Sequence, residues 1–273
     1  MRNHIFLVAQ DFAPSEAFSQ LGARARDRGL KFSLDLRNGK SDTPHQSLNL
    51  IDTALNANNF VFGIGMSSSP ELSECEISAC NFAILCDIPF GFYGDTYNCH
   101  ERAWFAPFRE KCAFFLALNE EEARKAKTVF PNAECVAVGN PLWEEFSFPE
   151  TTRENVRKDL QVEWDEILVL APGSKSAGIN IANWTALLSA LYLIKGSKFK
   201  VRIALHPGDV TPHEIYKEFM QWSPVNVEMT PASMKTSLFV PGADLVAEWN
   251  SSIAIEAAHQ GIPVISLANP FAE

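Results

Sequence analysis

A short polar turn near the C-terminal end of the chain carries residues suited to binding an anion. Asn250, Ser251 and Ser252 follow a predicted buried strand at residues 244–249 and precede a predicted helix at residues 253–260. A helix that begins directly after a parallel strand presents unpaired N–H groups and the positive end of its dipole. The turn therefore predicts a phosphate-binding site, although capping of the helix by either serine would explain the same residues.

Glu256 adds a carboxylate to this predicted helix, whose other residues are mostly Ile and Ala. In a capping box the glutamate lies three residues after the cap, but Ala254 and Ile255 occupy those positions. We therefore interpret Glu256 as a binding residue. The alternative is a solvated side chain that gains a little from the helix dipole.

Two earlier loops also follow predicted parallel strands. Gly173, Ser174 and Lys175 lie in a glycine- and serine-rich turn, where backbone N–H groups commonly meet a phosphate. The turn lacks the spacing of a P-loop, and a flexible surface loop is the alternative. His206 follows the next predicted strand, at a strand end where parallel sheets bind ligands. A structural hydrogen bond within the loop is the alternative for His206.

The elements that must position these loops alternate between strand and helix. Strands are predicted at residues 4–10, 31–37, 60–66, 83–86, 113–118, 134–138, 167–171, 200–205, 225–229, 244–249 and 264–267. Helices are predicted at residues 16–28, 48–55, 71–81, 120–130, 151–160, 183–194, 212–221, 233–238 and 253–260. This alternation predicts an α/β fold with parallel sheets flanked by helices, so loops after neighbouring strands converge on one ligand.

Residues 87–97 are rich in glycine and aromatic side chains, and we predict a loop there. It would either line a substrate cleft or pack on itself at the surface. Before the first predicted helix, a turn is expected at Asp11, Pro14 and Ser15.

The C-terminal pattern resembles a known family signature. Ala-Asp-Leu-Val at residues 243–246, the polar turn, and Glu-Ala-Ala-x-x-Gly-Ile-Pro-Val-Ile at residues 256–265 are similar to the donor-nucleotide signature of GT-B glycosyltransferases. Their relatives, the UDP-N-acetylglucosamine 2-epimerases and lipid-A-disaccharide-synthase-like proteins, share it more loosely. The resemblance implies that residues 250–252 hold the diphosphate of a nucleotide-sugar and that Glu256 accepts hydrogen bonds from the ribose.

The resemblance also assigns roles to the earlier loops. It implies that Gly173, Ser174 and Lys175 approach the diphosphate or the sugar, and that His206 lies near the nucleotide. Residues 231–234 would contact the base.

The implied architecture is two Rossmann-like domains with parallel sheets that face a cleft. Gly-Asn-Pro at residues 139–141 resembles the family's passage between domains. We predict an acceptor-side domain at residues 1–141, a connector at 142–164 and a nucleotide-sugar-binding domain at 165–273. GT-B proteins usually continue with further elements, so we expect a shortened C-terminal domain, with domain closure and activity in question.

The implied function is that of a glycosyltransferase of carbohydrate biosynthesis, hexosyltransferase-like and metal-independent. It would transfer a sugar from a nucleotide-diphospho-sugar, with UDP as the expected nucleotide, to an unidentified acceptor hydroxyl. The helix dipole at Ser251 and Ser252, with Lys175 or His206, would stabilise the departing diphosphate. A base must take the acceptor's proton, and we favour Asp11 or Glu16 because related enzymes often place this group after the first strand.

The proton-accepting group has other candidates, because Asp87, Asp95 and His100 also lie on plausible loops. The sequence Asp-Phe-Ala-Pro-Ser at residues 11–15 departs from the glycine-rich turn of the family.

Two other functions stay open. One is a UDP-sugar 2-epimerase, although the His-x-Glu-Ala-Gly-Leu-Arg element of that family is absent. The other is a non-catalytic relative that binds a nucleotide-sugar or a partner protein.

The composition narrows the class of protein. The 273 residues are 47% apolar and carry a formal net charge of -10, which disfavours nucleic-acid binding. No apolar run is long enough to span a bilayer and no signal-peptide pattern begins the chain, so we expect a soluble cytoplasmic protein. Neither the base of the nucleotide nor the oligomeric state follows from the sequence.

The cysteines do not form a recognisable metal site. They are Cys75, Cys80, Cys86, Cys99, Cys112 and Cys135. No C-x-x-C pair or usual zinc spacing is present, so we predict reduced, packed thiols. Cys99 and His100 form the single adjacent Cys/His pair, a weak candidate for a metal or nucleophile role. With no Asp-x-Asp motif, we predict neither a metal nor a cofactor beyond the nucleotide-sugar substrate.

Overall fold

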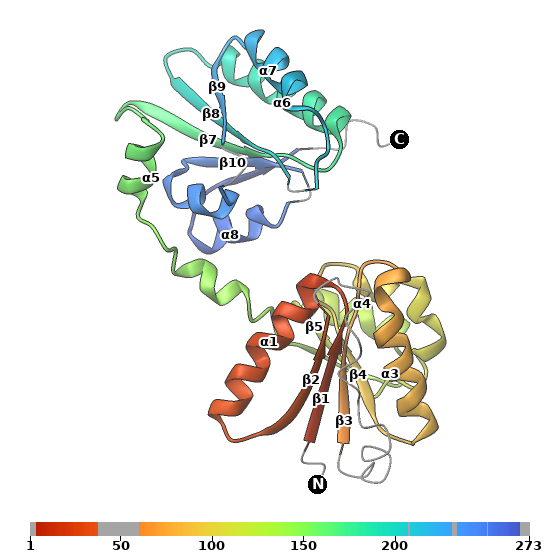
Figure 1. Cartoon of the computed structure of the whole chain (residues 1–273). Coiled ribbons are helices and arrows are strands. Elements are labelled where there is room, and N and C mark those ends of the chain that lie inside the picture. The colour runs from red at the N-terminus through yellow and green to blue at the C-terminus, as the bar shows by residue number, and fades with distance from the viewer. Residues whose placement is uncertain (1–3, 38–59, 207, 231–233, 250, 268–273) are drawn as a thin grey trace. The chain divides into compact units, whose positions relative to one another are not determined.

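The computed structural model describes residues 4–37, 60–206, 208–230, 234–249 and 251–267 (Figure 1). The chain divides into two compact units, residues 1–142 and residues 143–273. We call them unit 1 and unit 2. The helix predicted at residues 48–55 lies outside the described residues.

Unit 1 is built on a parallel sheet. Among its described residues the strand order is β2-β1-β3-β4-β5-β6, and every neighbouring pair is parallel. The strands are β1 (His4–Ala9), β2 (Lys31–Leu36), β3 (Phe60–Gly65), β4 (Phe90–Tyr93), β5 (Phe114–Ala117) and β6 (Glu134–Ala137). The helices are α1 (Phe12–Asp27), α3 (Glu74–Leu85) and α4 (Glu120–Val129), with 3₁₀ turns η2 (Glu71–Ser73), η3 (Cys99–Glu101) and η4 (Ala103–Phe108).

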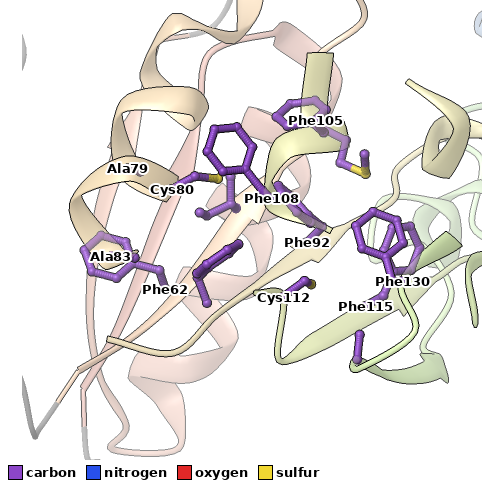
Figure 2. Packing of buried hydrophobic residues seen from close by; sticks show 14 of the residues in the cluster. Phe62, Ala79, Cys80, Ala83, Phe92, Phe105, Phe108, Cys112, Phe115 and Phe130 are labelled. Atoms are coloured by element: carbon purple, nitrogen blue, oxygen red, sulfur yellow. The ribbon is translucent and has the colours of Figure 1, made fainter. Parts of the chain in front are cut away.

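Alternate residues of the central strands form the cores on the two faces of this sheet, as the period of a strand requires. Leu7 and Ala9 of β1 pack with Phe18 of α1 on one face. Phe6 and Val8 pack into a phenylalanine-rich cluster on the other face. Figure 2 shows part of that cluster, in which rings from β3, β4 and β5 meet side chains of α3 and η4.

The start of α1 differs from the prediction. The expected turn at residues 11–15 is the first turn of the helix, which begins at Phe12 and continues through Pro14 and Ser15. Asp11 is the N-cap, and its carboxylate accepts the Phe12 N–H. A proline is tolerated in a first helical turn, because the N–H groups there have no intrahelical partner.

The predicted strand at residues 83–86 and the predicted loop at 87–97 were both wrong in part. Residues 83–85 are the end of α3, and the loop contains the fully buried strand β4. The glycines and the proline of this segment suggested a loop. However, a Cβ on Gly91 would collide with the carbonyl oxygen of Phe114, so this glycine permits close pairing with β5.

Unit 2 is also built on a parallel sheet. Within the part of unit 2 that is described, the strand order is β11-β10-β7-β8-β9, again parallel throughout. The strands are β7 (Glu166–Pro172), β8 (Lys198–Ala204), β9 (Asn226–Met229), β10 (Leu245–Glu248) and β11 (Val264–Ser266). The helices are α5 (Arg153–Asp159), α6 (Ala177–Leu193), α7 (His213–Gln221) and α8 (Ile253–His259), with 3₁₀ turns η5 (Trp143–Ser147) and η6 (Thr236–Gly242).

Helices cover both faces of the unit 2 sheet (Figure 1). Trp184 of α6 and Tyr216 of α7 pack against one face. Val156 of α5 and Ala257 of α8 pack against the other. The predicted connector at 142–164 therefore contributes α5 to the core of unit 2. The helix predicted at 183–194 begins earlier, at Ala177, and the polar residues Asn180 and Asn183 are buried within it.

The short helix predicted at 233–238 is the 3₁₀ segment η6 at residues 236–242. The other predicted strands agree with the structure to within a few residues, as does the α4 helix with its Asn119 cap. Local capping and continuous apolar runs suffice to locate these elements.

Candidate functional site

The sheet order of unit 2 brings the three predicted loops to one edge. β10, β7 and β8 are neighbours in the sheet and run in the same direction. The loops that follow them begin at Trp249, Gly173 and Leu205, and all leave from the carboxyl ends of these strands. We call this edge the donor edge. It is the part of a parallel α/β sheet where ligands bind.

In the loop after β7, Ser174 is engaged by its own helix. Its N–H donates to Oδ1 of Asn180 at 2.7 Å, and its hydroxyl donates to the same oxygen at 3.0 Å. Gly173 is buried, and a Cβ there would lie 3.0 Å from the Trp184 ring. Both residues contribute to packing and to the shape of the loop, and their contact with the donor stays a prediction.

Lys175 and His206 lie together across the loops after β7 and β8. The Lys175 side chain is exposed, and its Cε lies 3.3 Å from where a Cβ on Gly208 would be. The His206 ring packs at the same place, and its Nδ1 accepts the Gly208 N–H at 2.8 Å. This bond assigns the ring proton to Nε2.

The protonation state of His206 follows from its surroundings. Burial, followed by the positive charge of Lys175, lowers the pKa of His206 below its ordinary value, although Asp209 opposes the shift. The imidazole is therefore neutral at pH 7 and carries one N–H donor at Nε2. Beside the Lys175 ammonium, this pair offers hydrogen-bond donors and a positive charge, the requirements of a phosphate site.

The turn after β10 is closed by a residue that the sequence reasoning missed. The carboxylate of Glu248, the last residue of β10, accepts the Ser251 N–H at 2.6 Å. The Ser251 hydroxyl oxygen accepts the Ile253 N–H at 3.3 Å. Ser251 thus shapes the turn, whereas the N-cap of α8 is Ser252, whose side chain makes no capping hydrogen bond. Ser252 is exposed at the start of α8, and Asn250 lies outside the described residues.

Glu256 is buried on α8, with 8% of its surface exposed. Burial raises the pKa of its carboxyl group to about 7. With the described residues of unit 2 its side chain makes no hydrogen bond or ion pair. The solvated alternative for Glu256 is therefore wrong, and a buried carboxyl without a described partner is suited to accept hydroxyl donors from a ligand.

The carboxyl edge of unit 1 is acidic. We call it the acidic edge. Asp11, after β1, accepts hydrogen bonds from the Phe12 N–H at 2.8 Å, the Ser68 N–H at 3.1 Å and the Ser68 hydroxyl. Burial by itself raises the pKa of Asp11, but the hydrogen bonds from Ser68 and Phe12 outweigh it, and the pKa is lowered overall. Asp11 is therefore ionised at neutral pH.

The other predicted bases differ in their position. Glu16 lies in the second turn of α1 and is partly exposed. Asp87 is exposed in the turn before β4, at the opposite end of the strands from Asp11. Asp95, after β4, is 6% exposed, and burial raises its pKa to about 6 although Arg102 at 3.8 Å opposes this. His100 is buried 3.4 Å from the carboxylate of Glu122, an arrangement typical of a structural pair.

Glu76 is a second residue that the sequence reasoning missed. It is fully buried on α3, and its Oε1 accepts the Gln10 N–H at 2.9 Å and the Ser67 hydroxyl. The Ser67 oxygen in turn accepts the Asp11 N–H at 2.9 Å. Burial raises the pKa of Glu76 to about 7. Glu76 thus joins the ends of β1 and β3 beneath Asp11.

Comparison with known proteins identifies the fold. No protein-family model and no curated protein match the sequence. Solved structures do match. A glycosyltransferase from Rickettsia africae has a TM-score of 0.63 at 12% identity, over 97% of this chain and 79% of that chain. A putative UDP-N-acetylglucosamine 2-epimerase from Listeria monocytogenes has a TM-score of 0.61 at 10% identity, over 97% of this chain and 78% of that chain.

A third similar structure is HepE from Anabaena in complex with UDP, with a TM-score of 0.56 at 11% identity over 97% of this chain and 80% of that chain. The matches span both parallel sheets. The chain has the GT-B fold. The predicted α/β fold with two parallel sheets is thereby confirmed.

Within this GT-B fold, Cys99 does not provide a reactive thiolate. Burial raises the pKa of Cys99 to about 12, so its thiolate is not available at neutral pH. The described residues contain no group of three or more His, Cys, Asp or Glu side chains that could hold a metal ion. None of the helices that the structure describes is both long and apolar enough to cross a membrane.

The sequence held weak signals for the two missed acids. Glu248 ends a buried strand just before a run of small polar residues, and Glu76 is flanked by Cys75 and Ile77 in an apolar stretch. A charged residue inside an apolar pattern is rarely buried without a partner. The partners themselves, Ser251 for one acid and Gln10 and Ser67 for the other, could not be read from the spacing.

Proposed function

We propose that the protein binds a nucleotide-diphospho-sugar at the donor edge of unit 2 and transfers the sugar to an acceptor hydroxyl. The observation that carries the proposal is the convergence of Lys175, His206, Ser252 and Glu256 on loops or helices that follow neighbouring parallel strands. Similar folds support it. HepE from Anabaena was solved with UDP and with UDP-glucose, and MnaA from S. aureus with UDP.

Lys175 and His206 would act on the leaving group. When the bond between the anomeric carbon and the phosphate oxygen breaks, its electron pair stays on the diphosphate. The Lys175 ammonium and the Nε2–H of a neutral His206 would stabilise that growing charge. His206 is then a hydrogen-bond donor to the leaving group and not a base. Ser252 would add a hydroxyl or N–H donor at the start of α8.

Glu256 would bind the ribose. Its carboxyl group is buried and has a pKa of about 7, so hydroxyl donors from a sugar would favour the ionised form. Hydrogen bonds to a charged acceptor contribute about 1.5–3 kcal/mol each. Glu256 therefore supplies affinity for the nucleoside without touching the reacting bond.

Asp11 is the preferred base for the acceptor proton. It follows β1 directly, is ionised at neutral pH, and is held by Ser68 and by the Phe12 N–H. Glu16 lies further along α1, in its second turn, and is the alternative base. The transfer would form the bond from the acceptor oxygen to the anomeric carbon and leave the proton on Asp11.

One observation favours a second candidate, epimerisation at C2 of a UDP-sugar. Elimination and re-addition need acidic groups that exchange protons near neutral pH. Burial raises the pKa of Glu76 to about 7 and that of Asp95 to about 6, and both lie at the acidic edge. The product separates the candidates, since transfer releases free nucleoside diphosphate and epimerisation yields a C2-inverted sugar nucleotide.

Calorimetric titration with UDP, GDP, ADP, CMP and their common sugar conjugates tests the proposal. We expect saturable binding of one nucleotide, weakened by about 1–3 kcal/mol in Glu256→Ala through loss of charged hydrogen bonds. Glu218→Ala removes an exposed carboxylate of α7 and is the matched control. Absence of binding to every nucleotide would contradict the proposal. Binding without product from any sugar conjugate would favour the non-catalytic relative.

A further inference from the structure

A buried polar network joins the two loops that carry Lys175 and His206. Its centre is Asn180, the fourth residue of α6, which is 2% exposed. Asp209 reaches it from the loop after β8, and Tyr216 reaches it from α7. None of these three residues has a role in the proposed chemistry.

Asn180 fixes the shape of the loop after β7 through both ends of its amide. Its Oδ1 accepts the Ser174 N–H at 2.7 Å and the Ser174 hydroxyl at 3.0 Å. Its Nδ2 lies 3.0 Å from the Ser174 carbonyl oxygen. The Asn180 amide therefore satisfies the N–H, the hydroxyl and the carbonyl oxygen of Ser174, the residue that precedes Lys175.

Asp209 determines which way the Asn180 amide faces. Its Oδ2 lies 3.2 Å from Nδ2 of Asn180 and accepts the Tyr216 hydroxyl at 2.6 Å. Its Oδ1 accepts the Thr211 N–H at 2.9 Å. Burial raises the pKa of Asp209, but hydrogen bonds from Thr211 and Tyr216 outweigh this and lower it, so the carboxylate is ionised and only accepts. The amide nitrogen must face Asp209, which leaves the amide oxygen to face Ser174.

We propose that Asn180, oriented by Asp209 and Tyr216, is a positioning residue that holds the loops after β7 and β8 in their donor-binding form before the donor arrives. This inference rests on the proposed function of the donor edge. In this arrangement Ser174 hydrogen-bonds to Asn180, so Lys175 and His206 are the side chains of these loops that can contact the diphosphate. Loops that are ordered in advance lose less conformational entropy on binding, and this raises affinity.

The same helix offers a matched control. Asn183 lies three residues further along α6 and is also buried, at 7% exposure. Its side chain makes none of the described hydrogen bonds to Ser174 or Asp209, whereas the Asn180 amide bonds to both. Substitution of either residue by Ala removes a buried amide from α6, but only Asn180→Ala releases Ser174.

The experiment measures the Kd of UDP and the amide exchange of residues 173–176 in Asn180→Ala, Asn183→Ala and the unaltered protein. We expect Asn180→Ala to weaken UDP binding about tenfold, the effect of losing one well-formed hydrogen-bond set, and to speed exchange of the Ser174 amide. Asn183→Ala should leave both unchanged. The exchanged pair Asn180→Asp with Asp209→Asn restores the hydrogen bond between positions 180 and 209 but not the one to the Ser174 carbonyl oxygen, so it should recover part of the affinity that Asn180→Asp alone loses.

The outcomes separate this inference from the proposed function. If the unaltered protein binds UDP and Asn180→Ala binds it equally well, the inference is overturned while the proposed function stands. A loss of thermal stability in Asn180→Ala at unchanged Kd would show a merely structural role and would overturn it too. If the unaltered protein binds no nucleotide, the proposed function fails, and unchanged Ser174 exchange in Asn180→Ala would separately refute the ordering of the loop.

Discussion

The carboxyl edges of the two parallel sheets have opposite chemistry. The acidic edge of unit 1 carries Asp11, Glu76 and Asp95, and two of these acids are held almost fully away from water. The donor edge of unit 2 presents Lys175 with its exposed side chain and His206 with a neutral ring. The same strand geometry thus supports groups that accept protons in one unit and groups that bind anions in the other.

The difference shows how a repeated architecture acquires separate tasks. In unit 1 the residues after β1 and β3 hydrogen-bond to one another and to Glu76 of α3, and burial raises the pKa of Glu76 to about 7. In unit 2, Ser174 after β7 and Asp209 after β8 hydrogen-bond to Asn180 and so shape the two loops. The Lys175 side chain stays exposed to solvent. Function in such folds lies in the loops and not in the sheet.

The largest expected effect would come from removing the base at the acidic edge. In Asp11→Asn, we expect the rate of sugar transfer to fall by roughly 10²–10⁴-fold, the usual contribution of general base catalysis. The single amide oxygen can keep either the bond from Phe12 or those from Ser68 but not both, so we expect some loss of stability while UDP affinity, which we assign to unit 2, persists. Steady-state kinetics beside calorimetry would check this. Glu16→Gln is the control, and a larger loss there than in Asp11→Asn would move the base to Glu16.

The second expected effect concerns stability at the acidic edge. Burial raises the pKa of Glu76 from 4.5 to about 7, so the folded protein binds this proton more tightly than the unfolded chain. Stability should therefore fall as pH rises from about 4.5 to about 7, by up to about 3 kcal/mol from this group. Glu76→Gln should flatten that slope in urea titrations across this pH range. Equal slopes in both proteins would show that Glu76 does not titrate there.

A third, smaller effect would come from the cation at the donor edge. Lys175→Ala should weaken UDP binding by about 1–2 kcal/mol through loss of a charge-assisted hydrogen bond, and uridine binding should not change. Titration with both ligands would measure the difference. Lys217 is an exposed lysine on α7, so Lys217→Ala is a suitable control. An equal loss for uridine would show that Lys175 acts on the loop and not on the diphosphate.

The smallest expected effect is the number of protons released when UDP binds. Since the pKa of Glu256 is about 7, ribose hydroxyls that favour its ionised form should release up to about half a proton on UDP binding at pH 7. Calorimetry in two buffers with different ionisation enthalpies would measure the release. Glu256→Gln cannot titrate, so it should abolish this release. Proton release that persists in the variant would have to come from another group.

Local signals predicted much of the fold. Asn119 before three acidic residues predicted the cap of α4, and its side chain does accept the Glu122 N–H. Apolar runs predicted β7 and β8, and the polar turn before an apolar helix predicted the break between β10 and α8. Each of these features depends on residues within a few positions of one another, so the sequence pattern contains the cause.

Long-range contacts decided what the pattern could not. β4 was predicted as a loop because Gly91 and Pro89 are poor strand formers, yet pairing with Phe114 of β5 makes that glycine necessary. Asn180 lay outside the helix predicted at residues 183–194, but it is buried in α6, where Ser174 and Asp209 satisfy its amide.

Residue patterns alone indicate that parallel strands end in polar loops, and so which loops are candidates for an anion site and which acids are candidate bases. Contacts within the folded chain establish which of those side chains are engaged internally. Ser174 hydrogen-bonds to Asn180 and Ser251 to Glu248, whereas the side chains of Lys175 and Glu256 form no hydrogen bond with any residue that the structure describes. The physical reason is that burial and hydrogen-bond partners depend on residues distant in sequence, and these set both the pKa of an acid and the availability of a donor.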